Sequence, residues 1–141
     1  MQKPLIGHCL APINNNEVII AGGFSPKDDY DYNVNVVTYN LVTQEWYSQP
    51  WMDLKTSGPR MDSSCLGINY GPEKLIFMVG GWNNTFMKTT EYYRVDDESW
   101  YQLFVGNANL EQPALPHKIR SSGMVDVSGK VYSLGGVKCD R

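Results

Sequence analysis

The sequence is short of the residues on which most catalytic and metal-binding sites depend. It has 2 histidines and 3 cysteines, and neither His8 nor His117 stands at a metal-ligand spacing or beside a nucleophile and an acid. The cysteines are odd in number and far apart, which argues against a complete disulfide framework and against a zinc knuckle. We therefore expect no catalytic residue, no metal and no cofactor. We also expect a reducing, cytoplasmic compartment, with secretion as the alternative.

Basic residues and long apolar stretches are scarce as well. Lysines and arginines number 12 against 15 acidic residues, which gives a net charge of −3, and they form no cluster. Nucleic-acid binding needs a positive footprint for phosphates, so the composition excludes that class. No apolar stretch approaches the roughly 20 residues that span a bilayer, and residues 1–20 lack a charged leader followed by an apolar core. We expect neither a nucleic-acid nor a membrane partner.

The apolar residues instead gather in three runs that each end in a glycine pair. The pairs begin at Gly22, Gly80 and Gly135, so the steps between them are 58 and 55 residues. The runs are apolar at nearly every position, which is typical of strands with both faces covered. Repeated units of this length, with four strand-like segments each, indicate radially stacked antiparallel sheets.

An aromatic pair repeats with nearly the same period. Tyr39 and Trp46 recur as Tyr93 and Trp100, 54 residues further on. A hairpin with a two-residue turn at 42–43 would place Tyr39 directly opposite Trp46, and the same geometry holds for the second pair. Opposed aromatic pairs stabilise a sheet by up to about 1 kcal/mol relative to small residues. We expect these four residues to belong to the framework.

About two and a half such units fit into the chain, whereas closed propellers carry about 4 to 8 blades. We predict a first blade over residues 1–54, a second with its connector over 55–116, and the truncated start of a third over 117–141. The predicted fold class is all-β, with four-stranded antiparallel sheets forming an incomplete propeller. A free end leaves hydrophobic sheet exposed, so self-association through open blade faces is a further expectation.

An apolar strand ending in Gly-Gly, then a variable loop, then Tyr with Trp seven positions later, resembles the kelch repeat. The resemblance covers essentially the whole chain, and two of the three copies carry the Tyr-Trp spacing. It implies kelch-type β-propeller blades and a non-catalytic module that recognises a protein or peptide. Many members of the family are the substrate-recognition part of a ubiquitin-ligase adaptor, and others are associated with actin.

In the kelch family, the loops after the glycine pair and those entering the innermost strand build the recognition face. The resemblance implies this role for nine residues: Phe24, Ser25, Arg60, Ser63, Trp82, Asn83, Asn84, Arg120 and Ser121. Arginines offer planar forks to carboxylates, serines and asparagines adapt their hydrogen bonds, and exposed rings supply rigid contact area. The alternative is structural: such an arginine satisfies loop carbonyls, and Phe24 or Trp82 covers the end of a neighbouring blade.

Other signals favour ordinary interpretations. Asp28, Asp29 and Asp31 favour a solvated acidic loop over a cation site, because the glycine and terminal glutamate of a calcium loop are absent. Cys9 and Cys65 occupy similar places in two inner strands, where packing is the default interpretation. The alternative functions are a fragment of a propeller enzyme, such as a copper-radical oxidase, and an actin-associated structural protein.

Overall fold

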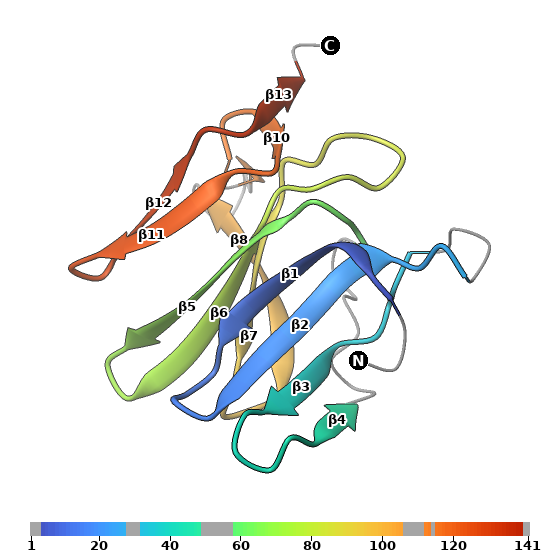
Figure 1. Ribbon diagram of the computed structural model, residues 1–141. Helices are drawn as coiled ribbons and strands as arrows, with labels where there is room; N and C mark the ends of the chain where they lie inside the picture. The colour runs from blue at the N-terminus through green and yellow to red at the C-terminus, as the bar shows by residue number, and fades with distance from the viewer. Residues whose placement is uncertain (1–3, 28–31, 49–57, 106–111, 114, 140–141) are drawn as a thin grey trace.

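The computed structural model describes residues 4–27, 32–48, 58–105, 112–113 and 115–139. Over these residues the chain forms thirteen antiparallel β-strands, which fall into three consecutive units (Figure 1). Unit 1 contains β1 to β4, unit 2 contains β5 to β9, and unit 3 contains β10 to β13. The prediction of an all-β fold built from four-stranded antiparallel sheets is confirmed. Within these residues no helix is long and apolar enough to span a membrane.

Unit 1 is a four-stranded meander in the order β1-β2-β3-β4. Its strands are β1 (Ile6–Pro12), β2 (Glu17–Phe24), β3 (Val37–Asn40) and β4 (Trp46–Ser48). The β3–β4 register pairs Tyr39 with Trp46, and the centroids of the two rings lie 4.5 Å apart. The opposition predicted from the seven-residue spacing is therefore confirmed.

Unit 2 repeats this meander and adds a short fifth strand at its outer edge. Its strands are β5 (Ser64–Tyr70), β6 (Glu73–Val79), β7 (Thr90–Arg94), β8 (Ser99–Val105) and β9 (Gln112–Pro113). Tyr93 lies opposite Trp100 in the β7–β8 register, with ring centroids 5.3 Å apart. Strand β9 falls in a segment for which the sequence predicts only a connector.

Unit 3 consists of two pairs of strands. These are β10 (Lys118–Arg120) with β13 (Val137–Cys139), and β11 (Gly123–Val127) with β12 (Lys130–Leu134). Ser128 and Gly129 join β11 to β12 and both have positive φ, 53° and 79°, as two-residue hairpin turns of type I′ require. A Ser-Gly pair between two strand-like segments predicts a turn from the sequence alone, and the structure confirms it.

The core lies between units 1 and 2, where each unit covers an apolar face of the other. Unit 1 contributes residues of β1 and β2 together with Val36, which precedes β3, while unit 2 contributes residues of β6 and β7. The fully enclosed cluster is Cys9, Ala11, Ile19, Ala21, Val36, Ile76, Met78 and Tyr93. Because every member is less than 9% exposed, the hydrophobic stabilisation of this region depends on the two units remaining together.

The glycine pairs lie where one unit meets the backbone of the next. The amide of Gly23 donates to the carbonyl of Arg60 at 2.7 Å, and the amide of Gly81 donates to the carbonyl of Ile119 at 2.8 Å. A Cβ at Gly22 would lie 2.5 Å from the Arg60 carbonyl oxygen, and a Cβ at Gly80 would overlap that of Ile119. The same contact thus occurs at both junctions, and the glycines permit it.

A disulfide also joins units 1 and 2. Cys9 in β1 and Cys65 in β5 are bonded, with their Cα atoms 5.5 Å apart, a separation typical of disulfides. The interpretation of these two cysteines as packing residues alone is wrong in this arrangement. The expectation of a reducing compartment depends on unpaired cysteines, and this bond removes its basis.

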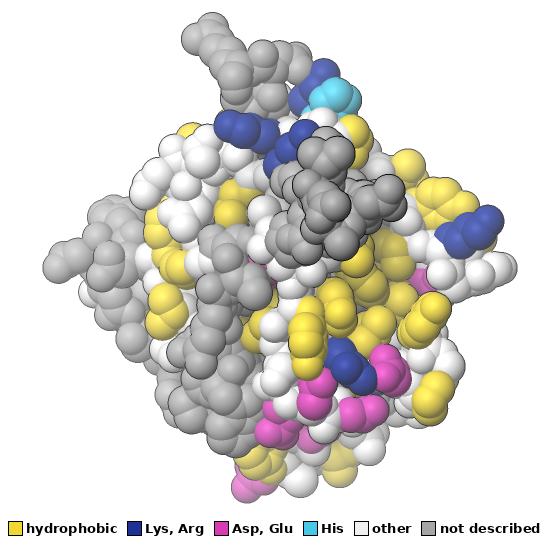
Figure 2. All heavy atoms as spheres, turned by 180° about the vertical axis from the view of Figure 1, so that it is seen from behind, with side chains coloured by type: hydrophobic (Ala, Val, Ile, Leu, Met, Phe, Trp, Pro, Cys, Tyr) yellow, Lys and Arg dark blue, Asp and Glu magenta, His cyan; other side chains and the backbone are white. Residues whose placement is uncertain are grey.

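Unit 2 exposes part of its apolar face beside the β11–β12 hairpin. A groove of about 370 Å³ lies there, between rings of β5, β6 and β7 and the hairpin residues Gly129 and Val131. Figure 2 shows hydrophobic side chains gathered on this rear side, next to a basic side chain with acidic neighbours. Tyr70 is 64% and Leu103 is 38% exposed. Exposed apolar sheet was expected of an open unit, and self-association through it remains a prediction.

Candidate functional site

The loops that follow the glycine pairs project toward one side of the molecule (Figure 1). We call this side the loop face and define it by described residues that follow the first two glycine pairs or lead into units 2 and 3. Its members are Phe24, Ser25, Tyr32, Arg60–Ser63, Trp82–Phe86 and Arg120–Ser122. All nine residues expected at a recognition site belong to it, but they differ widely in accessibility.

Arg60 is buried and serves the framework. Its side chain is 0% exposed and its Nη2 lies 2.6 Å from Oε2 of Glu91, which is also 0% exposed. Its Nη1 donates to the Gly80 carbonyl at 3.3 Å and to Thr89 Oγ1 at 3.0 Å. Burial lowers the pKa of the Arg60 guanidinium, and the charge of Glu91 opposes that shift. Arg60 is therefore not accessible as a contact residue: it pairs with Glu91 and satisfies the carbonyl of Gly80.

Ser25 and Ser63 are buried too, at 3% and 9% exposure. The hydroxyl of Ser25 accepts a hydrogen bond from the amide of Lys27 at 3.3 Å, so it supports the turn after the first glycine pair. The hydroxyl of Ser63 is buried without a hydrogen-bond partner among the described residues. A partner docking on the outer surface reaches neither side chain in this arrangement.

Trp82 and Arg120, both expected from the sequence, meet at the junction of units 2 and 3. The Arg120 guanidinium lies over the rings of Phe86 and Trp82, 5.0 Å and 5.7 Å from their centroids, and its Nη1 is 3.4 Å from Oδ2 of Asp62. Trp82 and Phe86 pack edge to face, with centroids 5.1 Å apart. We call Trp82, Phe86, Arg120 and Asp62 the Trp82 cluster.

The backbone holds the Trp82 cluster in place. Trp82 exchanges two hydrogen bonds with Met61, at 2.8 Å and 3.0 Å, and the carbonyl of Asp62 accepts from the amide of Ser121 at 2.8 Å. All four members are half-buried, so each side chain has one fixed side and one open side. A guanidinium held over aromatic faces gains cation–π attraction and is pre-oriented for a ligand.

Sequence reasoning missed two members of the cluster. Phe86 stands four residues after Trp82 in the same loop, and an aromatic residue at that distance is the signal that could have found it. Asp62 precedes the expected Ser63 and carried no signal, because its role depends on Arg120, which is 58 residues away.

Asn83 and Asn84 continue the loop face toward unit 1. The amide of Asn83 donates to the carbonyl of Thr85 at 3.0 Å, and the amide of Asn84 donates to the hydroxyl of Tyr32 in the unit 1 loop at 3.1 Å. Asn84 is exposed and has a positive φ of 54°. The half-buried Phe24 forms an isolated β-bridge with Tyr32 within the unit 1 loop, and the Asn84–Tyr32 hydrogen bond joins this loop to that of unit 2.

Ser121 is exposed, with a φ of 54°, at the entry to unit 3. Its neighbour Ser122 faces inward, where the hydroxyl of Ser64 contacts both the carbonyl and the hydroxyl of Ser122. Ser121 is therefore available for contacts, whereas Ser122 joins unit 2 to unit 3.

The loop face carries groups that recognise by contact: aromatic rings, the guanidinium of Arg120, amides and hydroxyls. Among the described residues, no group of three or more His, Cys, Asp or Glu could hold a metal ion. The three aspartates considered as a cation site, Asp28, Asp29 and Asp31, lie outside the described residues.

No protein-family model matches the sequence, and neither does any curated protein. Solved structures do match, and one is that of YjhT, with a TM-score of 0.69 and 17% sequence identity. The match covers 96% of this chain and 35% of the YjhT chain. This chain therefore spans about a third of the length of that neighbour. At this identity the likeness concerns the fold alone.

Proposed function

We propose that this chain is part of a kelch-type propeller and acts as a non-catalytic module that binds a protein or peptide on its loop face. The repeat supports the family assignment, because both unit junctions use the same glycine contact. Recognition of a substrate for a ubiquitin-ligase adaptor is the narrower form of the same proposal.

The Trp82 cluster is the observation that carries the proposal. Its rings and its guanidinium are partly exposed, yet they stand on a rigid framework of hydrogen-bonded strands. Residues of this kind dominate binding energy at protein interfaces, because large rigid side chains lose little entropy when they are covered. Asn83, Asn84 and Ser121 surround the cluster with adaptable hydrogen-bonding groups.

The test is a selection of peptides from a random library on the full chain, followed by affinity measurements on variants. We expect Trp82→Ala and Arg120→Gln each to weaken the selected peptides about tenfold or more, as loss of an interface anchor does. Tyr70→Ala is the control, because Tyr70 is 64% exposed in unit 2, at the opposite end of β5 from the loop face.

Arg120→Gln keeps the outcome independent of folding, since its partner Asp62 is itself partly exposed and the ion pair contributes little to stability. Thermal melting of each variant checks this. Failure to enrich any peptide, or enriched peptides that lose affinity with Tyr70→Ala but keep it with both loop-face variants, would count against the proposal.

A further inference from the structure

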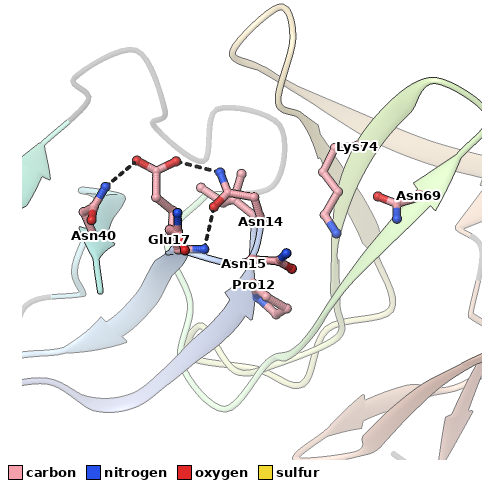
Figure 3. A pocket seen from close by; sticks show the side chains of 9 residues that line it. Pro12, Asn14, Asn15, Glu17, Asn40, Asn69 and Lys74 are labelled. Carbon is pink, nitrogen blue, oxygen red and sulfur yellow. Dashed lines mark hydrogen bonds between the residues drawn. The ribbon is translucent and has the colours of Figure 1, made fainter. Parts of the chain in front are cut away.

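A second hollow lies at the end of the units opposite the loop face. It has a volume of about 600 Å³ and is bounded by the β1–β2 turn and the start of β2 on one side, and by the β5–β6 hairpin on the other (Figure 3). Its lining is mainly polar, with amide, carboxylate and ammonium side chains. Volumes of this size are usual for sites that hold small molecules or single side chains of a peptide.

The unit 1 wall is ordered by its own hydrogen bonds. The carboxylate of Glu17 accepts from Asn14 Nδ2 at 2.8 Å and from Asn40 Nδ2 at 3.3 Å. The oxygen of Asn14 accepts from the amide of Asn16 at 2.8 Å, and that of Asn40 accepts from two amides of the β3–β4 turn. The charge of Glu17 is thus met by two amides, and these groups are largely occupied.

The unit 2 wall differs because its polar groups have no such partners. Asn69 and Lys74 are directly opposed in the β5–β6 register, so their side chains stand next to each other on one face. Among the described residues, the side chains of Asn69 and Lys74, and that of Asn15 on the unit 1 wall, make no hydrogen bond or ion pair with one another or with any neighbour. In Figure 3 the Lys74 ammonium lies between the amides of Asn15 and Asn69.

The two walls are fixed relative to each other by a close backbone contact. A Cβ at Gly67 in β5 would overlap the carbonyl oxygen of Pro12 at the end of β1. The hollow is therefore built into the junction of units 1 and 2 and does not depend on a flexible loop.

The chemistry of the unoccupied donors selects the ligand. The ammonium of Lys74 provides three N–H donors, and the amides of Asn15 and Asn69 provide two each. The ammonium also needs a negative charge, which the unit 2 wall does not supply. A single lysine without an arginine matches one negative charge better than the two of a phosphate. A carboxylate has one charge and two oxygens, and charge-assisted hydrogen bonds to it are the stronger kind.

We propose that this hollow binds a carboxylate group, seated between the Lys74 ammonium and the amides of Asn15 and Asn69. A hydroxyl or amide of the same ligand donates to the lone pairs that Glu17 retains on the facing wall. The site lies apart from the Trp82 cluster and does not rest on the function proposed for the loop face.

The test is a titration of the full chain, followed through backbone amide shifts in NMR spectra. Two carboxylates serve as probes, each with a neutral analogue: glucuronate with glucuronamide, and N-acetylglutamate amide with N-acetylglutamine amide. We expect saturable shifts at Asn15, Asn69 and Lys74 with the carboxylates, and binding weaker by about tenfold or more with the neutral analogues. Which carboxylate binds more tightly distinguishes a free sugar acid from an acidic peptide side chain as the natural source.

Lys74→Gln should weaken the better probe by the same factor, while Lys130→Gln, an exposed lysine at the start of β12, should leave it unchanged. Melting curves of both variants verify that the fold is intact. Equal binding of acid and amide, unchanged binding by Lys74→Gln, or shifts confined to other parts of the surface would each overturn the proposal.

Discussion

Arg60 illustrates how a side chain can look like a contact in the sequence and be framework in the fold. It stands at the entrance to an inner strand, where an arginine can face outward or inward. Glu91, 31 residues further on, holds it inside, and neither side chain is exposed. Its carbonyl meanwhile accepts the amide of Gly23 from unit 1. The backbone of Arg60 therefore joins unit 1 to unit 2, while its side chain holds together two segments of unit 2.

This pair makes a direct prediction at the residue scale. Glu91→Gln removes the only negative charge that the Arg60 guanidinium contacts among the described residues, and leaves a buried cation without compensation. We expect the free energy of unfolding to fall by about 3–5 kcal/mol, measured by urea denaturation. The matched control is Glu73→Gln, whose ion pair with Arg94 is about one-third exposed, and which should cost less than about 1 kcal/mol. Similar losses in both variants would contradict the assignment.

At the scale of elements, the glycine pair is the end of a strand and also a docking point for the next unit. Gly80 and Gly71 both have a φ of 60°, yet their surroundings differ. A Cβ at Gly80 would overlap the Ile119 carbonyl of unit 3, whereas nothing lies within 4 Å of a Cβ at Gly71. The backbone cost of an alanine is thus common to both positions, and the collision is specific to one.

We predict that Gly71→Ala lowers the free energy of unfolding by about 1–2 kcal/mol, the cost of a left-handed backbone for a residue with a Cβ. Gly80→Ala should cost about 1–3 kcal/mol more, because unit 3 must shift away from unit 2. Hydrogen exchange provides the second measurement: the amide of Gly81, which donates to Ile119, should lose protection in Gly80→Ala and keep it in Gly71→Ala. Equal destabilisation by the two substitutions would show that the close approach has no energetic role.

The sequence predicts these elements well wherever the controlling residues are close together along the chain. The opposition of Tyr39 and Trp46 and the turn at Ser128 and Gly129 follow from local spacing and turn chemistry, and both are confirmed. Strand β9 could not be predicted, because its two residues are ordered only by the edge of β8. The sequence also predicted nine of the loop-face residues, but not which of them are buried, since Arg60, for example, is held inside by partners 20 to 31 residues away.

At the scale of the whole molecule, an enclosed apolar core and a disulfide join units 1 and 2, whereas hydrogen bonds and the contacts of Arg120 join unit 3 to unit 2. The core cluster, the Arg60 backbone contact and the Cys9–Cys65 bond all lie at the first junction. At the second junction no disulfide joins the described residues, and the hydroxyls of Ser64 and Ser122 are hydrogen-bonded to each other instead. Hydrogen bonds of that kind contribute about 1 kcal/mol each, so unit 3 depends more on backbone pairing.

The disulfide makes the last prediction. Cys9 and Cys65 are 56 residues apart in sequence, and a cross-link closing a loop of that length stabilises a folded chain by about 4 kcal/mol in the chain-entropy model. Reduction should lower the free energy of unfolding by that amount, which is measured as a lower urea concentration at the unfolding midpoint. In the double variant Cys9→Ala, Cys65→Ala, a reductant should have no further effect, because the bond it breaks is absent. Thiol titration of the oxidised, unfolded chain should find one reactive thiol, since 3 cysteines are present and two are paired. Three reactive thiols in that experiment would mean that the units are held together by packing and hydrogen bonds without a covalent link.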